Sequence, residues 1–202
     1  GANEFRGIGG PLSVSPPRSP NPLNDTFIQA GVECQIPRND DFNGATQEGI
    51  GFYELTQDNG RRCSTAHAYL TPAKNRENLT IFKRSIAEKV MIENGRAIAV
   101  RAKIDGRAQI IRANKEVILS CGAFQSPQLL LLSGIGPKSK LEEHKIDQVL
   151  ELPGVGENLT DHLDYSLIYE SDSEYCLGRN ARSVFRVAMN QLQYLIFKRG
   201  VM

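Results

Sequence analysis

The sequence predicts a mixed α/β fold, and three observations support this prediction. Residues 86–111 contain three strand-like runs separated by Asn94-Gly95 and Asp105-Gly106, which are dipeptides typical of tight hairpin turns. A short apolar run at 116–120 is followed at once by a helical pattern. Residues 184–197 place apolar side chains at helical spacing. Strands and helices therefore occur together along the chain.

The composition is that of an ordinary globular protein. The 202 residues suit one or two domains with a sizeable core, and 40% of them are hydrophobic. Twenty-four basic and 23 acidic residues give a net charge of +1, without a long run of either sign, so nothing indicates a nucleic-acid partner. No apolar stretch approaches the roughly 18 residues of a membrane span. The opening residues 1–5 lack a leader pattern and do not begin with Met, so we expect sequence upstream.

The first third of the chain is predicted to be rich in loops. Residues 1–22 read as an extended segment, because Gly, Pro and Ser dominate them. A helix is expected over 22–31, with Asn24 or Asp25 as its N-cap. Residues 51–56 alternate like a strand, and 64–70 fit a short helix that ends before Pro72.

The remaining two thirds are predicted to be more regular. Strands are expected at 79–82, 86–92, 97–104 and 108–111, the last three forming a β-meander, and a buried strand at 116–120. The chain then turns at Cys121-Gly122-Ala123 into a helix with Ser126 as N-cap, Pro127 in first position and Gly134 at its end. Further helices are expected at 138–144 and 184–197. A core-facing amphipathic helix is favoured over a membrane-surface helix for 184–197.

Cysteine and histidine offer no metal pattern. Cys34, Cys63, Cys121 and Cys176 are far apart and form no CxxC pair, so free thiols are expected. Cys121 is expected to be a small buried hydrophobic residue rather than a redox or covalent group. His67, His144 and His162 show no metal spacing, and His162 is interpreted as part of a loop stabilised by Asn158 and Asp161 rather than as a catalyst.

The most informative segment is Gly122 to Gly136, where a buried strand, a turn of small residues and a capped helix are predicted in succession. By physics alone it is a strand-to-helix connection at which a ligand can approach the backbone. Its sequence, GAFQSPQLLLLSGIG, resembles the second signature of the glucose–methanol–choline (GMC) oxidoreductases. Ten restricted positions fit: Gly122, Ala123, Ser126, Pro127, Leu129, Leu130, Ser133, Gly134, Ile135 and Gly136.

The resemblance covers almost the whole chain. Residues 41–53 resemble a DxNG…QxGxGxY stretch, 60–70 a GxRxS…AYL stretch, 76–79 an RxNL motif and 152–162 an LPGVGxNLxDH motif. The branch that it resembles most contains the bacterial choline dehydrogenases and related primary-alcohol dehydrogenases.

The resemblance implies two interwoven domains. Residues 1–73 would belong to an antiparallel-sheet substrate domain, 74–158 to an FAD-binding Rossmann-like domain with its β-meander, and 159–202 would return to the substrate domain. The resemblance also implies cofactor contacts at Ala87, by its backbone to the adenine, and at Ser120, Cys121, Gly122 and Ala123, where a strand end nears the flavin.

The family's reaction implies what this chain supplies and what it lacks. A hydride passes from the carbinol carbon of an alcohol to flavin N5, while an active-site base takes the hydroxyl proton. The base is a His expected outside this chain, and no GxGxxG fingerprint is present, because 7–10 and 134–136 do not complete one. The chain alone is therefore predicted to be inactive, and no metal site is expected.

Three hypotheses about the function stay open. The first is an FAD-dependent dehydrogenase with a quinone-like acceptor, the second an oxidase that uses oxygen, and the third a non-catalytic truncated paralogue or scaffold. The alcohol and the oligomeric state are not specified by the sequence. The compartment is equally open between the cytoplasm, a membrane periphery and the secretory route.

Overall fold

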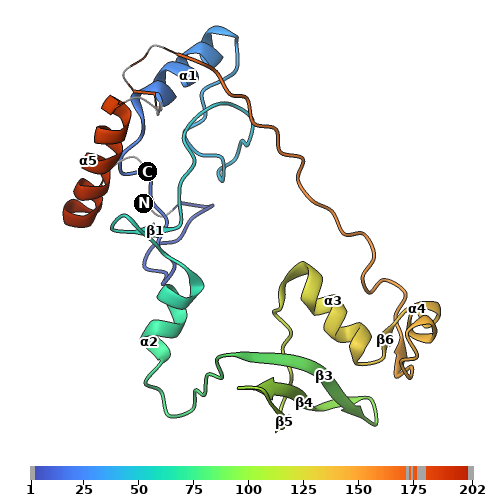
Figure 1. Cartoon of the computed structure of the whole chain (residues 1–202). Coiled ribbons are helices and arrows are strands. Elements are labelled where there is room, and N and C mark those ends of the chain that lie inside the picture. The colour runs from blue at the N-terminus through green and yellow to red at the C-terminus, as the bar shows by residue number, and fades with distance from the viewer. Residues whose placement is uncertain (1–2, 172, 174, 177–180, 200–202) are drawn as a thin grey trace. The chain divides into compact units, whose positions relative to one another are not determined.

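The computed structural model describes residues 3–171, 173, 175, 176 and 181–199, and these divide into two compact units (Figure 1). One unit is Thr80–Ser166, and the other joins Gly1–Leu79 to Leu167–Met202. Helices and strands occur in both, so the mixed α/β class is confirmed. Among the described residues, no helix has the length and apolar character required to cross a membrane.

The Thr80–Ser166 unit is built on the predicted β-meander. Its strands β3 (Ser85–Glu93), β4 (Arg96–Ile104) and β5 (Arg107–Arg112) pair antiparallel in the order β3-β4-β5. Asn94-Gly95 and Asp105-Gly106 form the two turns, with φ between 48° and 82°, as mirror-image hairpin turns require. The sequence prediction of three strands and two turns is confirmed.

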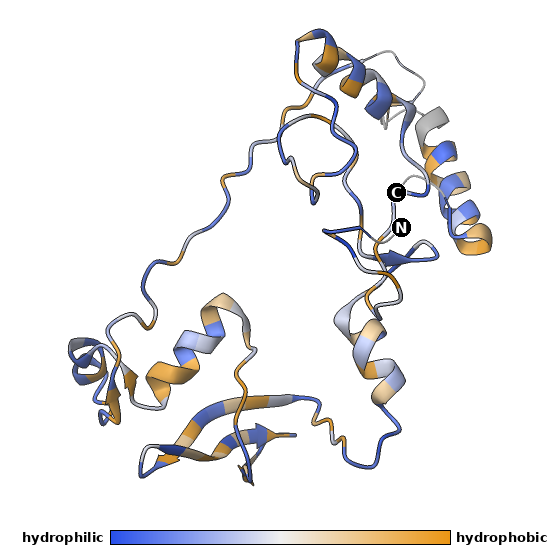
Figure 2. Cartoon of the chain, turned by 180° about the vertical axis from the view of Figure 1, so that it is seen from behind, coloured by the Kyte–Doolittle hydropathy of each residue, from blue (hydrophilic) through white to orange (hydrophobic). Residues whose placement is uncertain are grey.

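Buried and exposed side chains alternate in the second half of β4. On β4, Ala102 and Ile104 are buried while Arg101 and Lys103 are exposed, which is the alternation of a half-covered strand. Figure 2 shows the same alternation of hydrophobic and hydrophilic residues along the sheet. Register shifts interrupt the β3–β4 ladder between Ala87 and Lys89 and between Met91 and Ile92.

Two predicted strands are not formed. Residues 79–82 and 116–120 are irregular, and Ile118, expected inside, is 75% exposed. A strand exists only where a neighbour satisfies its N–H and C=O groups. No strand in the described part of the chain pairs with either segment, so an apolar run alone does not produce a buried strand.

Helix α3 (Gly122–Leu132) follows the second of these segments and starts four residues before the predicted N-cap. Cys121 precedes it, and Ser126 lies inside it, where its Oγ accepts a hydrogen bond from the backbone N–H of Cys121 at 3.0 Å. Ser126 therefore satisfies the helix start from within, and the N-cap prediction is wrong. The predicted end is confirmed, because Gly134 follows with φ of +85°.

A small parallel pair closes this unit. Strand β6 (Ile135–Gly136) pairs with β7 (Leu150–Glu151), and the two are connected by helix α4 (Lys138–Glu143), which confirms the helix predicted at 138–144. The two strands were not predicted. A Cβ at Gly134 would lie 2.4 Å from the backbone oxygen of Asp147, so this approach of two backbone segments requires glycine.

The other unit has little regular structure. It contains α1 (Pro22–Glu33), the hairpin β1 (Gln57–Asp58) and β2 (Arg61–Arg62), a π-helix η1 (Ala66–Leu70), α2 (Thr71–Ala73) and α5 (Ala181–Phe197).

Three local predictions in this unit are wrong. The N-cap of α1 is Asn21, whose Oδ1 accepts from the N–H of Leu23 at 3.0 Å, and not Asn24 or Asp25. Residues 51–56 form only an isolated bridge at Leu55, and α2 continues through Pro72. The strand at 51–56 and the helix end before Pro72 were therefore wrong.

Helix α5 forms as predicted but is not core-facing. Val184, Phe185, Leu195 and Ile196 are each more than 60% exposed, and the helix contributes no buried residue to the core of the described chain. The prediction of a buried apolar face is wrong for this chain. With only ten buried hydrophobic residues described, the expected sizeable core is also absent.

Candidate cofactor-facing site

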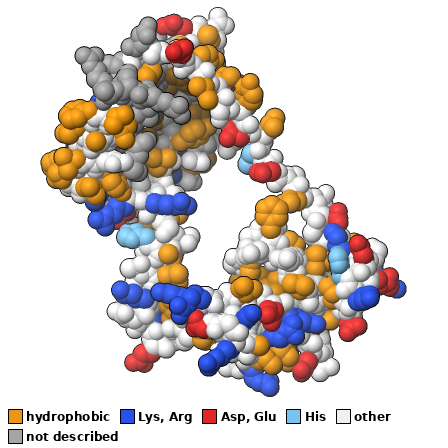
Figure 3. Space-filling view, in the orientation of Figure 1, with side chains coloured by type: hydrophobic (Ala, Val, Ile, Leu, Met, Phe, Trp, Pro, Cys, Tyr) orange, Lys and Arg blue, Asp and Glu red, His pale blue; other side chains and the backbone are white. Residues whose placement is uncertain are grey.

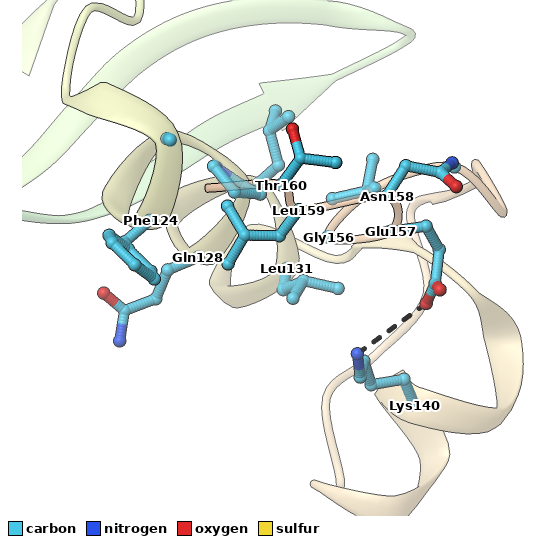
Figure 4. Close-up of a pocket in the computed structure, with 14 residues that line it drawn as sticks. Phe124, Gln128, Leu131, Lys140, Gly156, Glu157, Asn158, Leu159 and Thr160 are labelled. Carbon is cyan, nitrogen blue, oxygen red and sulfur yellow. Dashed lines mark ion pairs between the residues drawn. The ribbon is translucent and has the colours of Figure 1, made fainter. Parts of the chain in front are cut away.

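A cavity of about 670 Å³ lies within the Thr80–Ser166 unit. Helix α3 forms one wall, the loop 154–160 forms another, and Lys140 of α4 lies at the edge. Figure 4 shows Phe124, Gln128 and Leu131 on the helix side and Gly156 to Thr160 on the loop side. The cavity joins two segments that resemble separate family motifs.

The helix wall combines apolar side chains with the exposed first turn of α3. Ala123, Phe124 and Leu131 line the cavity, and Phe124 is 75% exposed. Pro127 has no N–H, so it cannot give the carbonyl of Ala123 its usual helical hydrogen bond.

The loop wall is held in place by one buried side chain and one ion pair. Val155 is buried, and Gly156 has φ of +82° with its Cβ position 3.8 Å from Cδ1 of Leu131. Lys140 Nζ lies 4.0 Å from a carboxylate oxygen of Glu157, as the dashed line in Figure 4 marks. Both side chains are partly exposed, so the pair contributes at most about 1 kcal/mol to stability.

Ser133 connects the helix of this site to the meander. It is the buried polar residue of the described chain: its hydroxyl donates to the carbonyl of Leu129 at 2.6 Å and accepts from the N–H of Val90 at 2.8 Å. The edge of β3 is thereby fixed to the end of α3. Ala87 lies on the same strand, three residues before Val90.

The structure places the five predicted cofactor residues in two groups. Ser120, Cys121, Gly122 and Ala123 are consecutive and exposed at the start of α3, and Ala123 also lines the cavity. Ala87 is exposed on β3 beside the register shift. The helix and the strand are in contact, but the described hydrogen bonds join them at Ser133 rather than at these residues. Their contact with a cofactor stays a prediction.

The histidines and cysteines form no catalytic pair in the described residues. The backbone N–H of exposed His162 donates to Oδ1 of Asp161, which fits the loop interpretation. His67 faces Asp58 at 3.5 Å on the surface, and His144 caps the end of α4. All four cysteines are free thiols as expected, but Cys121 is exposed, so its interpretation as a buried hydrophobic residue is wrong. The described residues hold no cluster suited to a metal ion.

Sequence reasoning did not find the cavity or the role of Ser133. The segment 152–162 was interpreted only as a family motif with a loop stabilised by Asn158 and Asp161, because a motif says nothing about which surface it faces. Ser133 was noted as a signature position, and a serine one residue before a helix-ending glycine gives no sign of a partner 43 residues earlier. Long-range polar contacts of this kind need coordinates.

The geometry is that of a segment of an α/β protein. Its β-meander is hydrogen-bonded, through Val90 and Ser133, to the end of the helix that follows a turn of small residues. Residues 2–164 match the model of the GMC oxidoreductase family. The chain belongs to this family.

Known relatives extend the comparison over the whole chain. The chain is 43% identical over 201 residues to the oxygen-dependent choline dehydrogenase of Rhizobium meliloti (strain 1021), covering 100% of this chain and 36% of that protein. It is 40% identical over 200 residues to an alcohol dehydrogenase (acceptor) of Pseudomonas putida, covering 98% of this chain and 36% of that protein. The chain therefore spans little more than a third of the length of these relatives.

The fold is also similar to that of a solved structure. An FAD-dependent oxidoreductase from Chaetomium thermophilum superposes with a TM-score of 0.84 at 24% identity, covering 99% of this chain and 35% of that one. This likeness supports the fold assignment alone.

Proposed function

We propose that the protein containing this chain is an FAD-dependent oxidoreductase that oxidises the CH–OH group of an alcohol of the choline or primary-alcohol type. The observation that carries the proposal is the 43% identity to a choline dehydrogenase over the full length of this chain. The identity of 40% to an alcohol dehydrogenase (acceptor) supports the same reaction class.

The residues at the start of α3 fit a flavin nucleotide. Gly122 has φ of +86°, and nothing lies within 4 Å of its Cβ position, so the backbone there is open to a close-packed ligand. Ser120, Cys121 and Ala123 flank it and are exposed. In this proposal they contact FAD through their backbone, Ala87 contacts the adenine, and FAD when bound supplies the hydride acceptor at N5.

The proposal assigns each part of the chain to a domain and places the catalytic base outside the chain. Residues 74–158 belong to the FAD domain in this proposal, and 1–73 and 159–202 belong to the substrate domain. In this proposal the base that takes the hydroxyl proton is a His outside the 202 residues, since His67, His144 and His162 are exposed and none of them lines the cavity. The proposed electron acceptor is quinone-like, and oxygen is the second candidate because one relative is named oxygen-dependent.

The test is anaerobic reduction of the flavin in the full-length protein. We expect choline or a primary alcohol to bleach the oxidised flavin band within the turnover time, and a quinone analogue to restore it. Reoxidation by air at an equal rate would assign the enzyme to the oxidases. A full-length protein that carries no flavin, or whose flavin no alcohol reduces, would favour the non-catalytic scaffold.

A further inference from the structure

Helix α3 and strand β3 are joined at one point that is closed to solvent. The backbone N–H of Val90 donates to Oγ of Ser133 at 2.8 Å, and no other hydrogen bond joins the meander to α3 or to Ser133 in the described part of the chain. Ser133 is 0% exposed and Val90 is 5% exposed, so this bond lies beneath the charged and hydrophobic side chains that Figure 3 shows on the surface of the Thr80–Ser166 unit. The bond therefore does not depend on what covers that surface in a longer protein.

The hydroxyl of Ser133 serves both elements at once. Its single hydrogen is donated to the carbonyl of Leu129, one turn earlier in α3, at 2.6 Å, so only lone pairs remain to face β3. Strand β3 lies at the edge of the β3-β4-β5 order, and the N–H of Val90 that faces Ser133 has no neighbouring strand to accept it in the described residues. Because a buried N–H without an acceptor is costly, the hydroxyl holds β3 at hydrogen-bond distance from the end of α3.

The proposed cofactor contacts lie on both elements, before this bond in the chain direction. Ala87 precedes Val90 by about 10 Å of strand. Gly122 is the first residue of α3 and Ser133 follows its last, which places Gly122 about 16 Å from the bond along the helix axis. A rotation of α3 by about 5° at Ser133 would move Gly122 by roughly 1.4 Å. A small change at the buried bond is therefore enlarged at the proposed contacts.

FAD joins an adenine and a flavin in one molecule, so its affinity depends on contacting two subsites together. Two linked binding groups gain affinity through effective concentration, and they lose this gain when the subsites are not at the separation that the ligand spans. In the proposed function, Ala87 contacts the adenine end and residues 120–123 contact the flavin end. The separation of β3 and α3 therefore contributes to FAD affinity beyond what either contact contributes alone.

We infer that Ser133 is a positioning residue for the cofactor: its buried hydroxyl holds β3 and α3 at the separation at which one FAD molecule reaches both subsites. The inference rests on the proposed function, because Ser133 acts only through Ala87 and residues 120–123. A residue that only stabilises the fold would affect every ligand alike. A positioning residue instead affects the ligand that spans both subsites more than a ligand that occupies one.

The experiment is titration of the full-length apoprotein with FAD, with FMN as the flavin half and with ADP as the adenine half. Flavin fluorescence follows FAD and FMN, and calorimetry follows ADP. The natural protein is compared with Ser133→Ala and with the control Leu141→Ala. Leu141 is 1% exposed and lies in α4, so its truncation leaves a cavity in the same unit without removing the Val90–Ser133 bond. Thermal unfolding sets a temperature at which all three proteins are folded.

We expect Ser133→Ala to raise the Kd of FAD about tenfold or more, because simultaneous contact with both subsites is lost. The Kd values of FMN and ADP should stay within about twofold of those of the natural protein. Leu141→Ala should leave all three Kd values within about twofold, although it destabilises the fold. If Ser133→Ala does not fold, Ser133→Cys is the second variant. Its thiol is a weak donor and acceptor, so the same pattern is expected with a smaller, severalfold rise for FAD.

Three results would overturn the inference. These are unchanged FAD affinity in folded Ser133→Ala, equal weakening of FAD, FMN and ADP by that variant, or equal weakening of FAD by Ser133→Ala and Leu141→Ala. Failure of the proposed function gives a different result. A natural full-length protein that binds no FAD refutes the cofactor site, and with it the role of Ser133, before any variant is compared.

Discussion

At the scale of single residues, two glycines with the same backbone conformation have different tasks. Gly134 has φ of +85° and Gly122 has φ of +86°, values at which a side chain is strained. The Cβ position of Gly134 is blocked by backbone, whereas that of Gly122 is open. The first position is therefore restricted by packing, and the second is free for a ligand.

Gly134→Ala is expected to destabilise the protein by about 2–4 kcal/mol, because left-handed strain adds to a clash with the carbonyl of Asp147 at 2.4 Å. Denaturant unfolding of the full-length protein measures the loss. Gly95→Ala is the matched control, with φ of +76° and nothing within 4 Å, and should cost only about 1 kcal/mol. Equal losses in the two variants would show that the backbone contact at Gly134 is unimportant.

Gly122→Ala should leave stability within about 1 kcal/mol of that of Gly106→Ala, which has φ of +82° and equally open surroundings. A methyl group at Gly122 would nevertheless occupy the space through which FAD approaches in the proposed function. We expect the Kd of FAD for the full-length apoprotein to rise about tenfold or more, which corresponds to about 1.4 kcal/mol. Fluorescence titration measures it, and unchanged affinity would remove Gly122 from the proposed contacts.

At the scale of elements, the link between α3 and β3 depends on one hydroxyl. Ser133→Ala leaves the buried N–H of Val90 without its partner at 2.8 Å, which should cost about 1–3 kcal/mol. Ser85→Ala removes an exposed hydroxyl that donates only to the carbonyl of Lys83, and should cost less than about 0.5 kcal/mol. Hydrogen exchange at Val90 should accelerate in the first variant only. Exchange that stays slow would mean that another group protects this amide.

Elements that carry their own signals were predictable from the sequence, and elements that need distant partners were not. The meander was found because Asn94-Gly95 and Asp105-Gly106 set both turns locally. The segment 116–120 was wrongly predicted to be a strand. Whether an apolar run forms a strand depends on a neighbouring strand, and its own sequence does not show whether one is present. The start of α3 was missed because Ser126 bonds backward to Cys121 and not forward into its own helix.

The same distinction applies to the site. Ser120 to Ala123 were selected from the resemblance, and the structure exposes their backbone at the start of α3. The opposite wall of the cavity, residues 154–160, was not predictable because its contacts join residues distant in sequence: Gly156 lies near Leu131 of α3, and Lys140 of α4 forms a weak pair with Glu157. Neither contact has a local sequence signature.

At the scale of the whole molecule, the described residues leave much apolar surface uncovered. Ile118 is 75% exposed, Leu163 100% and Ile168 94%, and α5 exposes its apolar side chains. Isolated exposed apolar residues are normal, but contiguous ones mark surfaces that contact other protein. Since the relatives are nearly three times as long as this chain, the remainder of such a protein is the natural covering.

The last prediction follows from this uncovered surface. The 202-residue chain produced alone should retain no flavin after gel filtration with added FAD, because it contains no GxGxxG turn to hold the pyrophosphate. It should also enhance the fluorescence of an apolar dye such as ANS severalfold more per mole than the full-length protein does, because its apolar residues stay in water.

A flavin band that elutes with the isolated chain would show that α3, β3 and the 154–160 loop hold the cofactor without the rest. Weak dye binding with a cooperative unfolding transition would show that this segment buries its apolar surface by itself, and would favour the scaffold over the enzyme segment.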